Sequence, residues 1–320
     1  MSRRTLLLLR WGVFLLACAF LFVRLSSNDA PISMEALGAV SAGREFRTLI
    51  AVVLGLMFVN WGLESRKWRL LVRDLEPISK WRAFIATIAG TPIGLITPNR
   101  VGEFVGRVLF LEPEHRIAAS FATAVGSIAQ FVVTVVLGLL GLIAMVLLAD
   151  PDRVSNDVAA LIGLCALVAG ATVLLYFNPD LLRATVARLP VIKRWERHAA
   201  VLERFSTGML TRVLVISALR YAVFTVQFAL LLAVFARGLS WTDAIASIPA
   251  TFLVATLIPT VMLTELGVRG SVAVALISPD SSQDHAVFLA STALWLINLG
   301  LPALAGGIIL LAARIRSARD

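Results

Sequence analysis

Long apolar runs, separated by short polar segments, follow one another along most of the chain. A helix needs about 20 predominantly apolar residues to cross a hydrocarbon core of ~30 Å. The runs of this character are 6–23, 48–63, 117–149, 158–177, 213–236 and 286–313. These six runs predict an all-α polytopic membrane protein, for which we expect about seven transmembrane helices in total.

Two further regions contain paired apolar pieces that are each too short to cross a membrane. The first pair is 83–96 and 104–111, and the second is 241–259 and 271–277. Irregular backbone at membrane depth is tolerated where protein or a cavity covers it, so two short halves around a break are typical of a re-entrant helical hairpin. We therefore predict two such hairpins. Their breaks are expected at Pro98, Gly102, Gly106, Pro259, Gly267 and Gly270.

The two predicted hairpins are similar to each other in sequence. The matching residues, at offsets of 160 to 162, are Trp81 with Trp241, Ala86 with Ala246, Pro98 with Pro259, Glu103 with Glu265, and Arg107 with Arg269. Three spans lie between the hairpins, which therefore enter from opposite sides and form an inverted repeat whose tips meet near the midplane. The predicted organisation is a single membrane domain over 1–320. Its parts are repeat 1 (about 47–149, hairpin 83–111), a basic connector (178–212) and repeat 2 (about 213–313, hairpin 242–277).

The distribution of charged residues predicts which side of the membrane each polar segment faces. Basic side chains gather in 66–82 and in the connector, whereas 150–157 and 279–284 are acidic or lack basic residues. The positive-inside rule places the basic segments and both chain termini in the cytoplasm. Within 66–82, Trp68 and Trp81 are expected to be aromatic interface anchors.

Composition restricts the function classes. Hydrophobic residues make up 59% of the 320 residues and charged residues 15%, which excludes a soluble globule. The net charge of +9 is explained by cytoplasmic loops, so we expect no nucleic-acid partner. Cys18 and Cys165 lie in apolar runs without metal or disulfide spacing. The start of the chain is similar to a lipoprotein signal peptide, but Arg10 interrupts its apolar region, so we expect an uncleaved first helix and leave the lipidation of Cys18 open.

Each hairpin tip carries a Glu with an Arg four residues later, Glu103/Arg107 and Glu265/Arg269, and the first tip adds Arg100. On a helix this spacing places both charges on one face. One interpretation is that each pair neutralises itself near the membrane interface. The alternative is a binding site: arginine suits phosphate because its planar group donates two parallel hydrogen bonds, and the three arginines outnumber the two acids. We therefore predict that these residues bind an anionic lipid headgroup.

The spans contain further polar residues. Arg220 is interpreted either as a residue that snorkels to the cytoplasmic surface or as part of the site. Gln130 and Asn298 are expected to hydrogen-bond between helices. The three histidines lie in loops or at span edges, and Asp29 lacks an acidic neighbour for a metal. We expect no catalytic residue, no metal and no cofactor.

Three short motifs carry a resemblance to a known family: Trp68-Arg69-Leu70-Leu71, Pro98-Asn99-Arg100-Val101-Gly102-Glu103 and Glu265-Leu266-Gly267-Val268-Arg269. They resemble the flippase-like transmembrane domain of the lysylphosphatidylglycerol synthetase family, over most of the chain. The departures are Asn99 and Glu265 where the family usually has Gly, Arg107 one residue late, and Gly270 at the usual position of a Glu. The family's soluble aminoacyl-transfer domain is missing, so the resemblance implies lipid translocation without lipid synthesis.

The sequence thus predicts translocation of an anionic lipid across a bacterial cytoplasmic membrane. An aminoacylated phospholipid and a polyprenyl-phosphate carrier are both open as the lipid. The first alternative is a non-transporting partner or regulator of a lipid- or glycan-modifying enzyme, which would dock on the basic connector. An intramembrane lipid-modifying enzyme is the second. A homo-oligomer and an enzyme partner are both compatible with the sequence.

Overall fold

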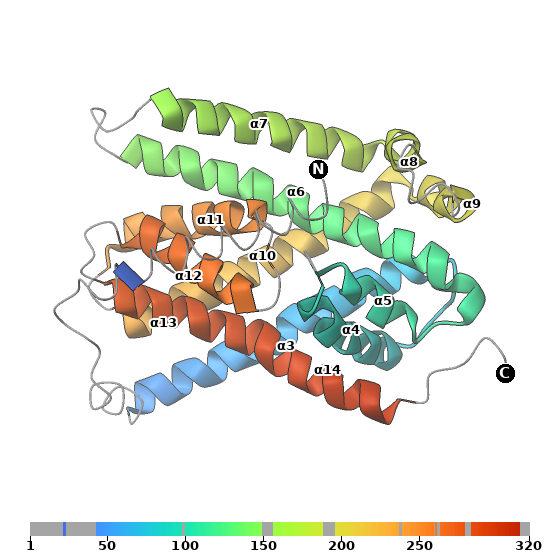
Figure 1. Cartoon of the computed structure of the whole chain (residues 1–320), viewed down its shortest axis with the longest axis horizontal. Helices are drawn as coiled ribbons and strands as arrows, with labels where there is room; N and C mark the ends of the chain where they lie inside the picture. The colour runs from blue at the N-terminus through green and yellow to red at the C-terminus, as the bar shows by residue number, and fades with distance from the viewer. Residues whose placement is uncertain are drawn as a thin grey trace. The chain divides into compact units, whose positions relative to one another are not determined.

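The structure is a computed structural model that describes residues 22–23, 43–97, 100–148, 156–187, 196–236, 239–258, 260, 263–278 and 283–313. Every regular element among these residues is a helix (Figure 1). The α-helices are α3 (Arg44–Val72), α4 (Lys80–Leu95), α5 (Gly102–Val108), α6 (Arg116–Leu148), α7 (Asn156–Phe177), α8 (Pro179–Ala187), α9 (Glu196–Ala199), α10 (Thr207–Phe235), α11 (Trp241–Leu257), α12 (Leu263–Ile277), α13 (Asp284–Trp295) and α14 (Leu301–Ala312). Two 3₁₀ segments, η2 (Pro113–His115) and η5 (Ala200–Arg204), and one π-helical segment, η6 (Leu296–Gly300), complete the set.

Five helical stretches among the described residues are long and apolar enough to cross a membrane. They are Arg44–Val72, Pro113–Leu148, Ala159–Phe177, Thr207–Phe235 and Asp284–Ala312. Each overlaps nearly the whole length of one of the predicted runs. Large apolar side chains such as Leu167 and Ile308 are exposed on them, as hydrocarbon contact requires. The chain is therefore a multi-pass membrane protein. With the run 6–23, which lies almost wholly outside the described residues, the helices make six, and the total of about seven stays a prediction.

The helices divide into two compact units. The first unit holds α3 up to Phe58, α6 from Leu137, α10 from Phe224, and α11, α12, α13 and η6. The second holds α3 from Val59, α4, α5, α6 up to Val136, α7 to α9, α10 up to Val223, and α14. The predicted single domain with two sequence repeats stays a prediction, as does the meeting of the hairpin tips.

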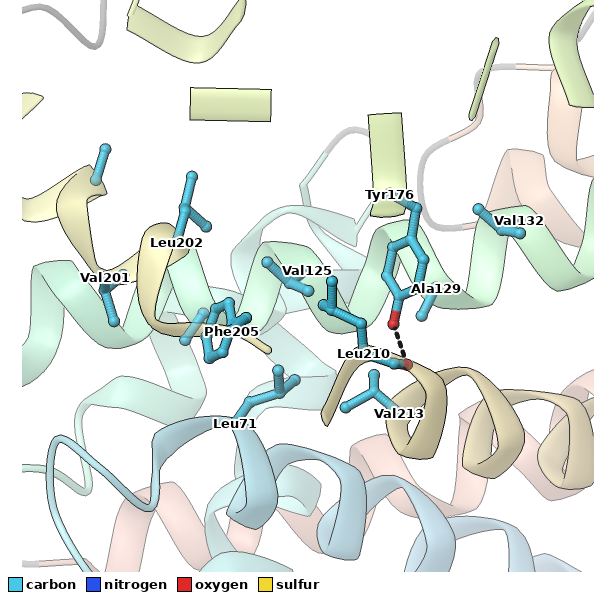
Figure 2. Close-up of a cluster of buried hydrophobic side chains, with 12 residues drawn as sticks. Leu71, Val125, Ala129, Val132, Tyr176, Val201, Leu202, Phe205, Leu210 and Val213 are labelled. Atoms are coloured by element: carbon cyan, nitrogen blue, oxygen red, sulfur yellow. Dashed lines mark hydrogen bonds between the residues drawn. The ribbon is translucent and has the colours of Figure 1, made fainter. Parts of the chain in front are cut away.

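The core of the second unit is an apolar cluster contributed by α3, α6, α7, α9, η5 and α10 (Figure 2). Tyr176 of α7 is buried in it, and its hydroxyl donates to the Leu210 carbonyl of α10 at 2.7 Å (Figure 2). A second cluster surrounds Trp68, which is 1% exposed and donates from Nε1 to Thr123 Oγ1 at 3.0 Å. The prediction that Trp68 is an interface anchor is therefore wrong, because packing between α3 and α6 buries it. Trp81 is exposed.

The short helices α4 and α5 pack against each other, with α14 on α4. An internal proline, Pro92, leaves the Ile88 carbonyl of α4 without its helical donor. Gly306 of α14 lies against this carbonyl and the proline ring, so closely that a Cβ there would collide with both. The absence of a side chain at Gly306 therefore allows α14 to reach the proline site.

The non-helical breaks within the two pairs of short helices, α4 with α5 and α11 with α12, are shorter than predicted. Gly102 and Gly106 lie inside α5, and Gly267 and Gly270 lie inside α12. Helix α12 begins at Leu263 with Glu265 in its first turn, where an acidic side chain is favoured by the helix dipole. Pro98 and Pro259 lie outside the described residues. Whether either helix pair enters a membrane as a re-entrant hairpin stays a prediction.

In the first unit, α6 packs on α11 around a second internal proline, Pro249. Gly138 and Gly141 allow this approach, since a Cβ at Gly141 would lie 2.8 Å from the Pro249 Cβ. Gln227 of α10 is buried and donates to the Val53 carbonyl of α3 at 2.9 Å. These contacts give the first unit its own packed core.

The π-helical segment has a local cause. Pro302 has no N–H to donate to the carbonyl four residues earlier, that of Asn298. The backbone widens at Leu296–Gly300 and then resumes as α14. Asn298 donates to the Leu294 carbonyl of its own helix at 3.2 Å, and its expected bond between helices stays a prediction.

Candidate functional site

A polar stripe on α3 is the foundation of the site. Asn60, Glu64 and Lys67 are spaced at i, i+4 and i+7, which places them on one helix face. All three are buried, although they lie at the end of a long apolar run. Burial of charged groups is costly unless they are paired, so each needs partners from neighbouring helices.

Glu64 is bound by three cations. Its Oε1 accepts from Arg107 Nη1 of α5 at 2.6 Å, and its Oε2 lies 2.7 Å from Lys67 Nζ. Oε2 also accepts from Arg220 Nη1 of α10. One carboxylate therefore holds α3, α5 and α10 together through buried ion pairs.

The glycines of α4 and α5 bring Arg107 to this position. Gly90 and Gly94 in α4 and Gly106 in α5 are spaced so that the two backbones touch, as small residues four apart allow. A Cβ on Gly90 would lie 2.8 Å from the Glu103 carbonyl, and one on Gly94 would collide with the Glu103 side chain. Close packing of α5 thus directs the Arg107 side chain towards α3.

Glu103 links Arg107 to Arg100. Its Oε2 accepts from Arg107 Nη2 at 2.9 Å, and its Oε1 pairs with Arg100 Nη2. Arg100 has φ of 59°, a left-handed conformation that strains a residue with a Cβ. Its side chain is 30% exposed, against 6% for Arg107. Arg100 is therefore the most accessible cation of the group and is held in a strained backbone position.

Thr97 fixes the approach to this strained residue. Its Oγ1 donates to the Ile93 carbonyl and accepts from the Gly102 N–H at 2.7 Å. The end of α4 is thereby tied to the start of α5, which has no side-chain cap of its own.

Arg220 joins the group from α10. Its Nε donates to Asn60 Oδ1 at 2.9 Å, and its Nη1 donates to Gln130 Oε1 at 3.2 Å. Gln130 of α6 in turn donates to the Ser217 carbonyl at 3.4 Å, so its predicted bonding between helices is confirmed. Of the two interpretations of Arg220, the structure supports an inward side chain bound by α3 and α6.

The second predicted pair lies in the first unit. Arg269 Nη2 and Glu265 Oε1 are 2.8 Å apart on α12, with the carboxylate buried and the guanidinium partly exposed. The spacing of four residues therefore gives an ion pair in both units. That both pairs face one ligand stays a prediction.

Glu64 and Lys67 are the residues that the sequence interpretation missed. Lys67 was assigned to a cytoplasmic basic segment, but it is 2% exposed, whereas the neighbouring Arg66 is exposed. Counting basic residues ignores helix phase, so the burial of Lys67 was missed. The side of the membrane on which this segment lies stays a prediction. The signal that could have identified them is the i, i+4, i+7 spacing of polar residues at the end of an apolar run, which places them on one face of a helix.

We call six residues the ion cluster: Glu64, Lys67, Arg100, Glu103, Arg107 and Arg220. Four are cations and two are carboxylates, so 4 − 2 gives an excess of two positive charges among these described residues. An uncompensated charge excess in a buried site is unfavourable, and an anion would relieve it. Arginine and lysine donors around a carboxylate also suit phosphate.

A scan of protein families matches residues 7–318 to the lysylphosphatidylglycerol synthase TM region. The chain belongs to this family. No curated protein and no solved structure matches the chain. The family match contains both helix pairs and the whole ion cluster. It also occupies nearly all of the 320 residues, which contain no soluble synthase domain in addition to the TM region.

Proposed function

We propose that this protein translocates an anionic lipid across a bacterial cytoplasmic membrane, as a transporter and not as an enzyme. The observation that carries the proposal is the ion cluster, which joins the short helix α5 to the membrane-crossing stretches of α3 and α10 and holds an excess of two positive charges. Membership of a lipid-related membrane family supports the same function.

The headgroup would bind first at Arg100. This side chain is the most exposed cation of the cluster, and its partner Glu103 also contacts Arg107. Two guanidinium groups beside one carboxylate can donate several charge-assisted hydrogen bonds to a phosphate. Lys67 and Arg220 add positive charge from α3 and α10 without direct exposure.

The acyl chains would remain in the lipid while the polar headgroup crosses through protein. In this mechanism the site opens alternately to the two sides by movement of helix groups, as in transporters built from repeats. Glu265 and Arg269 of α12 would provide the second contact for the headgroup during the crossing. Both termini would lie in the cytoplasm, as the basic segments indicate.

The test is a flipping assay in proteoliposomes with a fluorescently labelled anionic lipid and a membrane-impermeant quencher. Arg100→Gly is the informative variant, because glycine accepts the left-handed backbone of this position while removing the cation. We expect the folded variant to lose at least about 90% of the flipping rate, since about 1.4 kcal/mol of lost binding is a factor of ten.

Two controls make the result interpretable. Arg100→Lys keeps the charge and should retain part of the activity, and Arg73→Gln removes an exposed arginine outside the cluster and should retain all of it. Flipping that survives Arg100→Gly unchanged would contradict the site. Absence of flipping for every anionic lipid tested would contradict the translocator and favour the non-transporting partner.

A further inference from the structure

The excess charge of the ion cluster carries information about the class of headgroup, an inference that rests on the proposed function. A phosphodiester headgroup carries one negative charge and would leave one positive charge uncompensated. An aminoacylated headgroup adds ammonium groups and would leave more. A phosphomonoester carries close to two negative charges at neutral pH, because its second pKa is about 6. It therefore matches the excess of two positive charges on the cluster.

The two carboxylates of the cluster are held very differently. Glu64 is contacted by three cations from three helices, and its side chain is 6% exposed. Glu103 is contacted by two cations, and its side chain is 12% exposed beside the partly exposed Arg100. Replacing Glu103 breaks fewer contacts, so Glu103 is the carboxylate that an incoming anion displaces.

We propose that the ion cluster selects a phosphomonoester headgroup, whose dianion replaces the Glu103 carboxylate between Arg100 and Arg107. In the ligand-free protein the Glu103 carboxylate occupies the position of the anion and pairs with both arginines. When the headgroup binds, the Glu103 carboxylate leaves the space between the two arginines but stays within the cluster, so the dianion still balances the excess of two charges. Glu64 continues to hold Lys67, Arg107 and Arg220. Glu64 is thus a positioning residue, and Glu103 is an internal competitor of the ligand.

Binding of matched short-chain probes tests this selection without any transport step. Isothermal titration calorimetry on the full chain in detergent micelles at pH 7 would compare dihexanoyl phosphatidic acid with dihexanoyl phosphatidylmethanol, which differ by one methyl ester. We expect the monoester to bind about tenfold more tightly or better, since a second unit charge near the cluster is worth about 1 to 4 kcal/mol. Equal binding of the two probes, or binding of neither, would overturn the proposal.

Variants separate charge selection from simple loss of the site. Lys67→Met lowers the excess from two to one, so the preference for the monoester should fall towards unity. Arg100→Gly does the same in a backbone position that favours glycine, which protects the test if the lysine variant fails to fold. Glu103→Gln removes the competitor, so both probes should bind more tightly. Weaker binding in Glu103→Gln would contradict displacement and assign Glu103 a structural role.

A soluble phosphomonoester identifies the source of the ligand. If sn-glycerol 3-phosphate binds at least tenfold more weakly than dihexanoyl phosphatidic acid, the ligand is a lipid. Equal binding of the two monoesters would support the phosphomonoester selection but contradict lipid as its source, and with it the proposed function. Conversely, charge selection in micelles with no flipping in proteoliposomes would contradict translocation and leave this inference standing.

Discussion

Neutralising Glu64 is the single change that we expect to destabilise the ion cluster most. Glu64→Gln leaves Lys67, Arg107 and Arg220 buried around an amide and raises the excess charge from two to three. Removing one partner of a buried ion pair costs about 3–5 kcal/mol, because the remaining charge is left without compensation. We therefore expect the free energy of unfolding to fall by about 3–5 kcal/mol.

The measurement is SDS-induced unfolding in mixed micelles, followed by far-UV circular dichroism. Asp74→Asn is the matched control, since Asp74 follows the same helix and pairs with Arg73, with both side chains more than half exposed. An exposed pair contributes about 0–1 kcal/mol, so the control should unfold almost as the unaltered protein does.

The double variant Glu64→Gln/Lys67→Met tests the reasoning further. Because it removes one charge of each sign, its destabilisation should be less than the sum of the single effects by about 0.5–3 kcal/mol. A loss for Glu64→Gln no larger than that of Asp74→Asn would refute the claim that Glu64 holds the cluster together. Strict additivity in the double variant would refute its direct coupling to Lys67.

Three further changes test the packing around the cluster. Gly94→Ala places a Cβ against the Glu103 side chain and should lower the free energy of unfolding by about 1–3 kcal/mol through overpacking. Its control is Gly62→Ala, which has no neighbouring atom within 4 Å of the new Cβ and should be neutral or slightly stabilising in the same unfolding assay. Thr97→Val removes the hydroxyl that links α4 to α5, so it should cost about 1 kcal/mol and slow flipping; an unchanged flipping rate would contradict its role in placing Arg100. Tyr176→Phe removes a buried hydrogen bond of a residue outside the ion cluster (Figure 2), so it should lower stability by about 1 kcal/mol and leave flipping of folded protein unchanged.

The membrane-crossing helices could be predicted from the sequence because length and apolar composition determine them directly. The runs 48–63 and 158–177 fall inside α3 and α7, and neither prediction depends on tertiary contacts. Helix ends were less predictable. The apolar piece 271–277 was expected to follow a polar break, but α12 begins at Leu263 because a Glu in the first turn favours a helix start.

The candidate site was predictable only in part. The Glu103/Arg107 pair could be found because its members are four residues apart on one helix. Glu64 is 43 residues from Arg107, and their ion pair forms only when α5 packs on α4 through glycines. The burial of Lys67 was missed because a rule about loop charge cannot distinguish the buried face of α3 from its exposed face.

The most direct test of the central claim is an experimental structure with a bound anionic lipid, determined in nanodiscs that contain phosphatidic acid. The account predicts phosphate density within hydrogen-bond distance of Arg100 and Arg107, about 2.7–2.9 Å, with the Glu103 carboxylate turned away and Glu64 still bound to Lys67. Lipid phosphate bound elsewhere, with Glu103 still between Arg100 and Arg107, would contradict it.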